Sequence, residues 1–102
     1  MLNKKNIIDM HFHIWDSNVL DIPWLSLFDG KLKKKYSLNN YFSAINGLNI
    51  VLSCYEEVDA IKAQHKKEAQ MILQICEDSS NQIVGATIAA DLSSPGFKQY
   101  IS

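Results

Sequence analysis

Three short apolar runs separated by helix-like segments constrain the fold of this 102-residue chain more than any other feature. The runs cover residues 6–14, 49–55 and 82–90 and are rich in β-branched, aromatic or small apolar side chains. Continuous apolar runs of this length are typical of strands buried on both faces. Such strands, when they alternate with helices, form parallel sheets with right-handed crossovers. The sequence therefore predicts an α/β fold with parallel strands.

The segments between these runs carry helix signals. Ser37 is a suitable N-cap for a helix with apolar residues at helical spacing, and Asn46-Gly47 is a natural stop. Asp59 is expected to cap a longer helix over residues 60–77, which has an apolar stripe spaced mostly by threes and fours.

The predicted order is strand, helix, strand, helix, strand and then the first turn of a helix over residues 97–101. A long irregular segment at 15–36, part of which is expected to be short helix, follows the first strand. This order leaves open sheet edges, which natural folds cover or close. One interpretation is the first three βα units of an incomplete (β/α)8 TIM barrel. Because a complete barrel needs about 250 residues, residues 1–102 would then be a single, incomplete N-terminal domain. The other interpretation is a small three-layer sheet with a short final helix.

Composition and charge narrow the classes of function. Ten lysines and no arginine balance eleven acidic residues to a net charge of −1, which gives no general attraction to nucleic acid or anionic membranes. No apolar run approaches the roughly 20 residues of a membrane helix, and the N-terminus does not resemble a secretory signal. Cys54 and Cys76 lack a CxxC pattern and indicate reduced thiols. We therefore expect a cytoplasmic protein that binds neither nucleic acid nor membranes.

The sharpest chemical motif is the pair His11 and His13 at the end of the first predicted strand. Because residues two apart on a strand point to the same side, the imidazoles are expected side by side, with Asp9 on the same face. Neutral imidazoles are good ligands of zinc and similar divalent metals, and parallel barrels build active sites at this end of their strands. The alternative is a pair of strand-end histidines that bond to backbone or water.

Glu57 is the second candidate, just past the end of the second predicted strand. By strand alternation it shares a face with Val51, Ser53 and Tyr55. If that face looks into a barrel, the carboxylate lies on the same rim as the histidines. It would then be a metal ligand, a catalytic acid or base, or a partner that orients an imidazole. The alternative is a solvated loop glutamate.

These residues resemble a known superfamily. Residues 7–16, I-I-D-M-H-F-H-I-W-D, are similar to the first strand of the amidohydrolase superfamily, and more specifically of its amidohydrolase 2 branch, which includes lactonases and related decarboxylases. Members of that branch commonly begin with I-D-x-H-x-H, followed closely by tryptophan and an acidic or polar residue. Later segments that resemble the same branch follow in the same order, at residues 55–59, 68–69, 83–86 and 94–101.

The resemblance implies a (β/α)8 barrel that hydrolyses a lactone or another C–O or C–N bond of a small-molecule substrate. It implies a mononuclear metal or none, depending on the subfamily, and the expected cofactor is a divalent metal, zinc. His11 and His13 match the histidines of the family's first strand, and Glu57 matches a glutamate after its second strand. The family's later site residues, a histidine from a middle strand and an aspartate from the last, have no counterpart here.

Two ligands leave a zinc site incomplete, because catalytic zinc usually has three protein ligands. We therefore expect the chain alone to be inactive or nearly so, and a C-terminal fragment to complement it. Two other interpretations stay open. A non-catalytic α/β module would self-associate or bind a partner through its open sheet edges. A phosphoesterase or deoxyribonuclease barrel has a similar first strand, although Trp15 and residues 55–59 argue against it.

Overall fold

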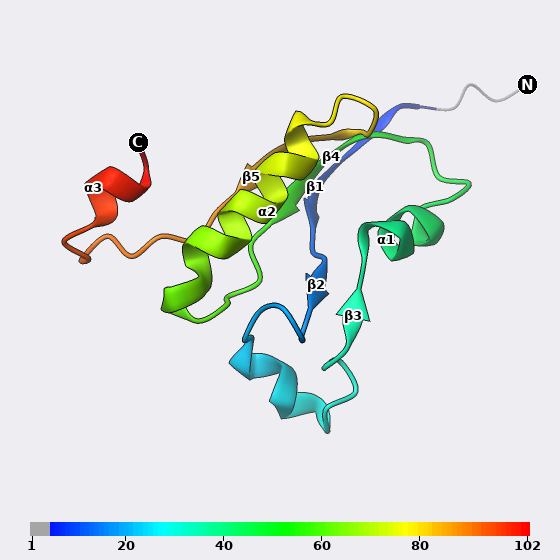
Figure 1. Cartoon of the computed structure of the whole chain (residues 1–102). Helices are drawn as coiled ribbons and strands as arrows, with labels where there is room; N and C mark the ends of the chain where they lie inside the picture. The colour runs from blue at the N-terminus through cyan, green and yellow to red at the C-terminus, as the bar shows by residue number, and fades with distance from the viewer. Residues whose placement is uncertain (1–4) are drawn as a thin grey trace, which may run out of the picture.

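The computed structural model describes residues 5–102, which are built around a three-stranded sheet (Figure 1). Its strands are β1 (Ile7–Phe12), β4 (Ile50–Glu56) and β5 (Ile83–Thr87). They lie in the order β1-β4-β5, and both neighbouring pairs are parallel. Figure 1 shows the helix α2 (His65–Glu77) lying across one face of this sheet. The predicted α/β class with parallel strands is therefore confirmed.

The first helix follows its capping residues as predicted. α1 (Leu38–Ala44) begins after Ser37, whose hydroxyl oxygen accepts a hydrogen bond from the backbone amide of Asn40. The Asn40 side chain in turn accepts one from the backbone amide of Ser37, which completes a capping box. The helix ends before Gly47, whose φ of 86° favours glycine.

The second helix begins later than predicted, at His65 instead of residue 60. Asp59 does not cap it, because its φ of 57° lies in the left-handed region, whereas an N-cap residue normally has extended backbone. The Asp59 amide donates to the Glu57 carboxylate at 2.6 Å, which fixes a turn at this point. A short 3-10 helix, η2 (Lys62–Gln64), then leads into α2.

The segment at 15–36, predicted to be irregular, contains short regular elements. These are β2 (Trp15–Asp16), the 3-10 helix η1 (Pro23–Phe28) and β3 (Lys35–Tyr36), and β2 pairs antiparallel with β3. The Trp24 indole donates to the carbonyl of Val58 at 2.7 Å, which attaches η1 to the loop after β4. After β5 the chain continues to a short helix, α3 (Phe97–Tyr100), which lies to one side of the sheet in Figure 1.

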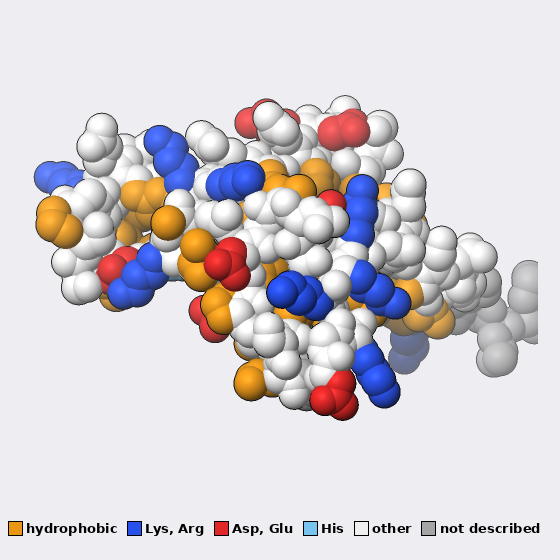
Figure 2. Space-filling model, turned by 60° about the horizontal axis from the view of Figure 1, so that its bottom comes forward, with side chains coloured by type: hydrophobic (Ala, Val, Ile, Leu, Met, Phe, Trp, Pro, Cys, Tyr) orange, Lys and Arg blue, Asp and Glu red, His pale blue; other side chains and the backbone are white. Residues whose placement is uncertain are grey.

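The core lies between the sheet and the elements that cover it. Its buried members are Phe12, Leu20, Ile22, Leu25, Tyr55, Val58, Ala60, Ile72 and Ile83. Other apolar side chains of the strands are exposed: Ile7, Ile8, Met10, Val51, Leu52 and Val84. On the side of the molecule seen in Figure 2, charged side chains are interspersed with apolar ones. In the described part of the chain, no helix has the length and apolar character needed to cross a membrane.

A series of hydrogen bonds joins Gln82, the residue before β5, to β4, α1 and β1. The Tyr41 hydroxyl donates to Asp9 Oδ2 at 2.6 Å, so it accepts from the Ser53 hydroxyl, 2.7 Å away. Ser53 is fully buried, and its oxygen accepts from the Gln82 amide at 3.0 Å. Burial, followed by the hydrogen bond to Asp9, raises the pKa of Tyr41 from 10.0 to about 12.

Removal of the Tyr41 hydroxyl should destabilise the protein and change its response to alkaline pH. In Tyr41→Phe, Asp9 and Ser53 each lose a partner, and we expect the free energy of unfolding at pH 7 to fall by about 1–3 kcal/mol. Between pH 10 and about 12, folded Tyr41 keeps its proton while the unfolded chain loses it, so stability falls as pH rises through this range. This fall should be shallower in Tyr41→Phe. Urea denaturation followed by circular dichroism from pH 8 to 12 measures both effects.

Tyr36→Phe is the matched control, because the Tyr36 hydroxyl has no hydrogen bond among the contacts of residues 5–102. It should lose little stability and keep the wild-type pH dependence. Equal pH dependence in the two variants would argue against the role of Tyr41.

Candidate functional site

The two histidines lie at the carboxyl end of β1, next to an irregularity in that strand. Asp9 pairs with Ser53 and Phe12 with Tyr55, so β1 has one residue more than β4 over this stretch. Such a bulge interrupts the alternation of side chains. Asp9 and Phe12 consequently lie on the same side of the sheet, where both contact Tyr41 of α1.

The expected position of Asp9 beside the imidazoles is therefore wrong. Its Oδ2 accepts from Tyr41, and its Oδ1 accepts from the backbone amide of His11 at 3.1 Å. Strict alternation, on which the expectation rested, does not hold across a bulge. Asp9 instead supports the backbone that carries the histidines.

His11 and His13 are brought together as predicted. Their Nε2 atoms lie 3.1 Å apart, their ring centroids are 4.8 Å apart, and the ring planes are nearly perpendicular, at 84°. Both side chains are exposed. Two ligands at about 2.0–2.1 Å from a tetrahedral zinc ion lie about 3.3–3.4 Å apart. The separation of the two Nε2 atoms is thus close to that of two ligands sharing a metal.

A backbone carbonyl selects the tautomer of His13. Its Nδ1 lies 2.8 Å from the carbonyl oxygen of Glu56, which can only accept. Nδ1 therefore carries the proton, and in the neutral ring Nε2 presents its lone pair toward His11. Metal-binding histidines are commonly oriented by such bonds, so this tautomer suits metal ligation. The sequence contains no side-chain signal for this partner, because it is a main-chain atom.

Glu57 directly follows β4, at the same end of the sheet as the histidines. Its amide donates to the Thr87 carbonyl at 3.1 Å, and its Oε2 accepts from the Asp59 amide. Strand alternation assigned Glu57 to the same face as Tyr55. That face looks toward the helices, because the Tyr55 hydroxyl donates to Glu68 of α2. The Glu57 carboxylate therefore stabilises the turn at 57–59. Among the described residues, no hydrogen bond joins it to His11 or His13.

Within residues 5–102, no three His, Cys, Asp or Glu side chains cluster closely enough to hold a metal ion. The histidine pair supplies two ligands, one fewer than the three protein ligands usual in catalytic zinc sites. The donor type, the ring separation and the His13 tautomer fit a metal, while the ligand number fits only part of such a site.

Comparisons with known proteins point to one family. No family model matches the chain, and no curated protein matches it. A solved structure, amidohydrolase 2 from Bifidobacterium longum subsp. infantis, is 31% identical in sequence and matches 86% of this chain with a TM-score of 0.66. The chain spans 34% of the length of that protein. The resemblance to the amidohydrolase 2 family that the motifs predicted is thereby confirmed for a segment equal to about a third of a family protein.

Proposed function

We propose that this chain is the N-terminal part of a metal-dependent hydrolase of the amidohydrolase 2 family, and that its sheet is the beginning of a (β/α)8 barrel. The observation that carries the proposal is the approach of two imidazole Nε2 atoms to 3.1 Å at the carboxyl end of a parallel strand. In (β/α)8 barrels, active sites lie at this end of the strands. The sequence and structural similarity to an amidohydrolase 2 protein supports the same conclusion.

His11 and His13 are the residues that would hold the metal, for which zinc is our first choice. A bound divalent metal lowers the pKa of a water or polarises a carbonyl. The chain itself orients the His13 ring, because Glu56 accepts from its Nδ1, and it supports the backbone of His11, whose amide donates to Asp9. Because Tyr41 holds Asp9 in place, the support of this pair extends to α1.

Glu57 is our candidate for the acid or base that would act together with this pair. It follows Glu56, whose carbonyl orients His13, so its backbone position is tied to the histidines. The amide of Asp59 holds its carboxylate in one orientation at 2.6 Å. The chemistry we propose for the whole protein is hydrolysis of a lactone or another C–O or C–N bond of a small molecule.

The remaining ligands would come from a complementing C-terminal portion. Such a portion would cover the free edges of β1 and β5, which have no strand partner within residues 5–102, and the exposed apolar side chains of the strands. With two histidine ligands, the 102-residue chain by itself should show little activity.

The second candidate is a module that binds another copy of itself or a partner through the same surfaces. It is favoured by the exposure of Ile8 at 53%, Met10 at 65% and Val84 at 56%. Light scattering of the purified chain measures whether it self-associates, and the zinc measurements below test whether it uses the histidines. Because a module of this kind has no need of the histidines, the two measurements together distinguish the candidates.

Zinc binding by the full chain should depend on the histidine pair. In a calorimetric titration with zinc chloride, His11→Ala and His13→Ala should each weaken binding at least tenfold, because one imidazole remains in each. His65→Ala removes the third histidine of the chain, which lies on α2, and should bind like the wild type. If His65→Ala loses as much affinity as the other two, the metal site is not where we propose.

A chimera tests the hydrolase function. The segment of the Bifidobacterium protein that matches this chain is replaced by this chain, and the product is assayed on a panel of lactones and amides. We expect hydrolysis, and a loss of at least about 100-fold in His13→Ala, because mutation of a residue that only hydrogen-bonds to a metal ligand already costs about 10–100-fold. Glu57→Gln should lower the rate and alter its pH profile, whereas Glu77→Gln, at the exposed end of α2, should do neither. A folded chimera with zinc bound and no activity would contradict the proposal.

A further inference from the structure

Glu56 is the last residue of β4, and the direction of its side chain follows from that of its neighbour. Tyr55 points toward α2, because its hydroxyl donates to Glu68. Tyr55 and Glu56 pair with Ala86 and Thr87 of β5, and no bulge interrupts the strand between them. Successive side chains of a regular strand point to opposite faces. The Glu56 side chain therefore lies on the face of the sheet away from α2.

The histidine pair lies on the same face. Phe12 pairs with Tyr55, and their rings meet edge to face with 5.7 Å between centroids, so Phe12 also points toward the helices. His11 and His13 flank Phe12, are exposed and approach each other at Nε2, which places them on the opposite face. The Nδ1 atom of His13 donates to the main chain of Glu56 at 2.8 Å. The Glu56 side chain thus begins next to the pair and on its side of the sheet.

Glu56 differs from the other acidic side chains that follow these strands. Glu57 accepts from the Asp59 amide at 2.6 Å. Asp91, after β5, forms an ion pair with Lys62 at 3.3 Å. The half-buried Glu56 carboxylate has no hydrogen bond or ion pair within the described part of the chain, where Glu56 bonds through its main-chain carbonyl. Its oxygens can therefore accept hydrogen bonds from a ligand.

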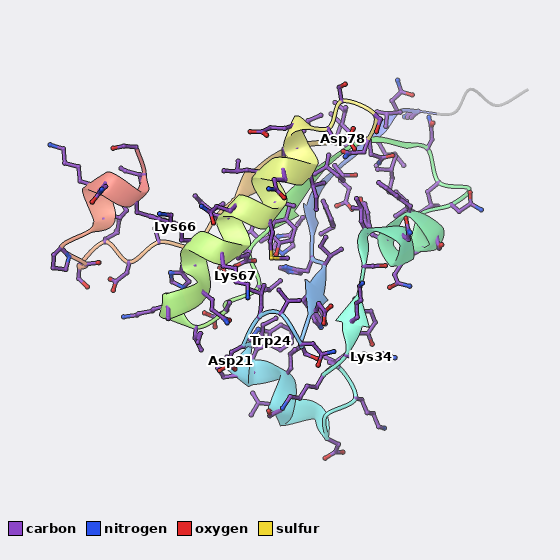
Figure 3. All side chains as sticks on the ribbon, in the orientation of Figure 1. Asp21, Trp24, Lys34, Lys66, Lys67 and Asp78 are labelled. Atoms are coloured by element: carbon purple, nitrogen blue, oxygen red, sulfur yellow. The ribbon has the colours of Figure 1, made fainter. Side chains whose placement is uncertain are left out.

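The surroundings of Glu56 also point to a ligand. Among the described residues, no three side chains cluster as metal ligands, so the Glu56 carboxylate is not a third ligand of the pair. The lysines labelled in Figure 3 lie elsewhere, since Lys66 and Lys67 belong to α2 and Lys34 precedes β3. The helices of a (β/α)8 barrel form its outer ring, so the face that carries Glu56 becomes the interior. A charge enclosed there without a donor is unfavourable.

We propose that Glu56 binds the substrate, by accepting a hydrogen bond from a hydroxyl group on the carbon next to the carbonyl that is hydrolysed. This inference rests on the proposed function, which places that carbonyl at the histidine pair. An ionised carboxylate only accepts hydrogen bonds, and it binds a hydroxyl more strongly than a neutral acceptor does. Neighbouring strands lie about 4.8 Å apart, so groups held by β1 and β4 can contact neighbouring atoms of one small molecule.

Charge favours a hydroxyl over the other common substituents. A carboxylate at this carbon would be repelled by Glu56. An ammonium group would bring a positive charge next to the divalent ion proposed at the histidines. A hydroxyl supplies the donor without a charge. The substrate class is therefore a 2-hydroxy lactone or a 2-hydroxy amide.

The chimera described above tests this inference on pairs of substrates that differ by one hydroxyl. These are α-hydroxy-γ-butyrolactone with γ-butyrolactone, and the two corresponding γ-lactams. Glu56→Ala should raise KM for the hydroxylated member at least tenfold, because a hydrogen bond to a charged group typically strengthens binding by about one to two powers of ten. KM for the unsubstituted member should change less than about twofold. Calorimetric titration with the products, 2,4-dihydroxybutyrate and 4-hydroxybutyrate, gives the same comparison without turnover.

Glu56→Gln keeps one acceptor oxygen and should give a smaller effect of the same kind, and it carries the test if Glu56→Ala fails to fold by circular dichroism. Glu77→Gln, at the exposed end of α2, should behave like the parent chimera. Equal changes for both members of a pair, or no change in either, would overturn the role of Glu56 while hydrolysis still supports the proposed function. A folded chimera with zinc bound that hydrolyses neither pair would contradict the hydrolase function and this inference together.

Discussion

The hydrogen bond from Tyr41 to Asp9 is the interaction on which the arrangement of β1 depends. It fixes Asp9 on the helix side of the sheet, and the bulge that follows keeps Phe12 on that side as well. Phe12 enters the core, 5% exposed, while the histidines on either side of it remain exposed. Without the bulge, strict alternation would place Asp9 on the side opposite to Phe12. The pairing of the two imidazoles is therefore tied to a contact on the other face of the sheet.

Much of the fold could be predicted from local sequence patterns. The apolar runs identify β1, β4 and β5, and Ser37 with Gly47 marks the limits of α1, because these signals depend on nearby residues. The late start of α2 could not be predicted in this way. Asp59 is a good N-cap by residue type, but the Glu57 carboxylate holds it in a left-handed turn.

The candidate site likewise has features that local sequence predicts and features that it does not. The spacing of His11 and His13 predicts their proximity, which the structure confirms. The bulge and the carbonyl of Glu56 escape sequence reasoning, because each depends on pairing between segments far apart in the chain.

The bond between His13 and Glu56 joins residues 43 positions apart. It forms only when β1 and β4 have paired, so the orientation of the ring and the closure of this long loop are one event. Closure of a loop costs conformational entropy that grows slowly with its length. Any ion that prefers the oriented ring must, by thermodynamic linkage, also favour the closed loop. Metal binding at His13 and the pairing of the first two parallel strands are thus thermodynamically coupled, and each favours the other.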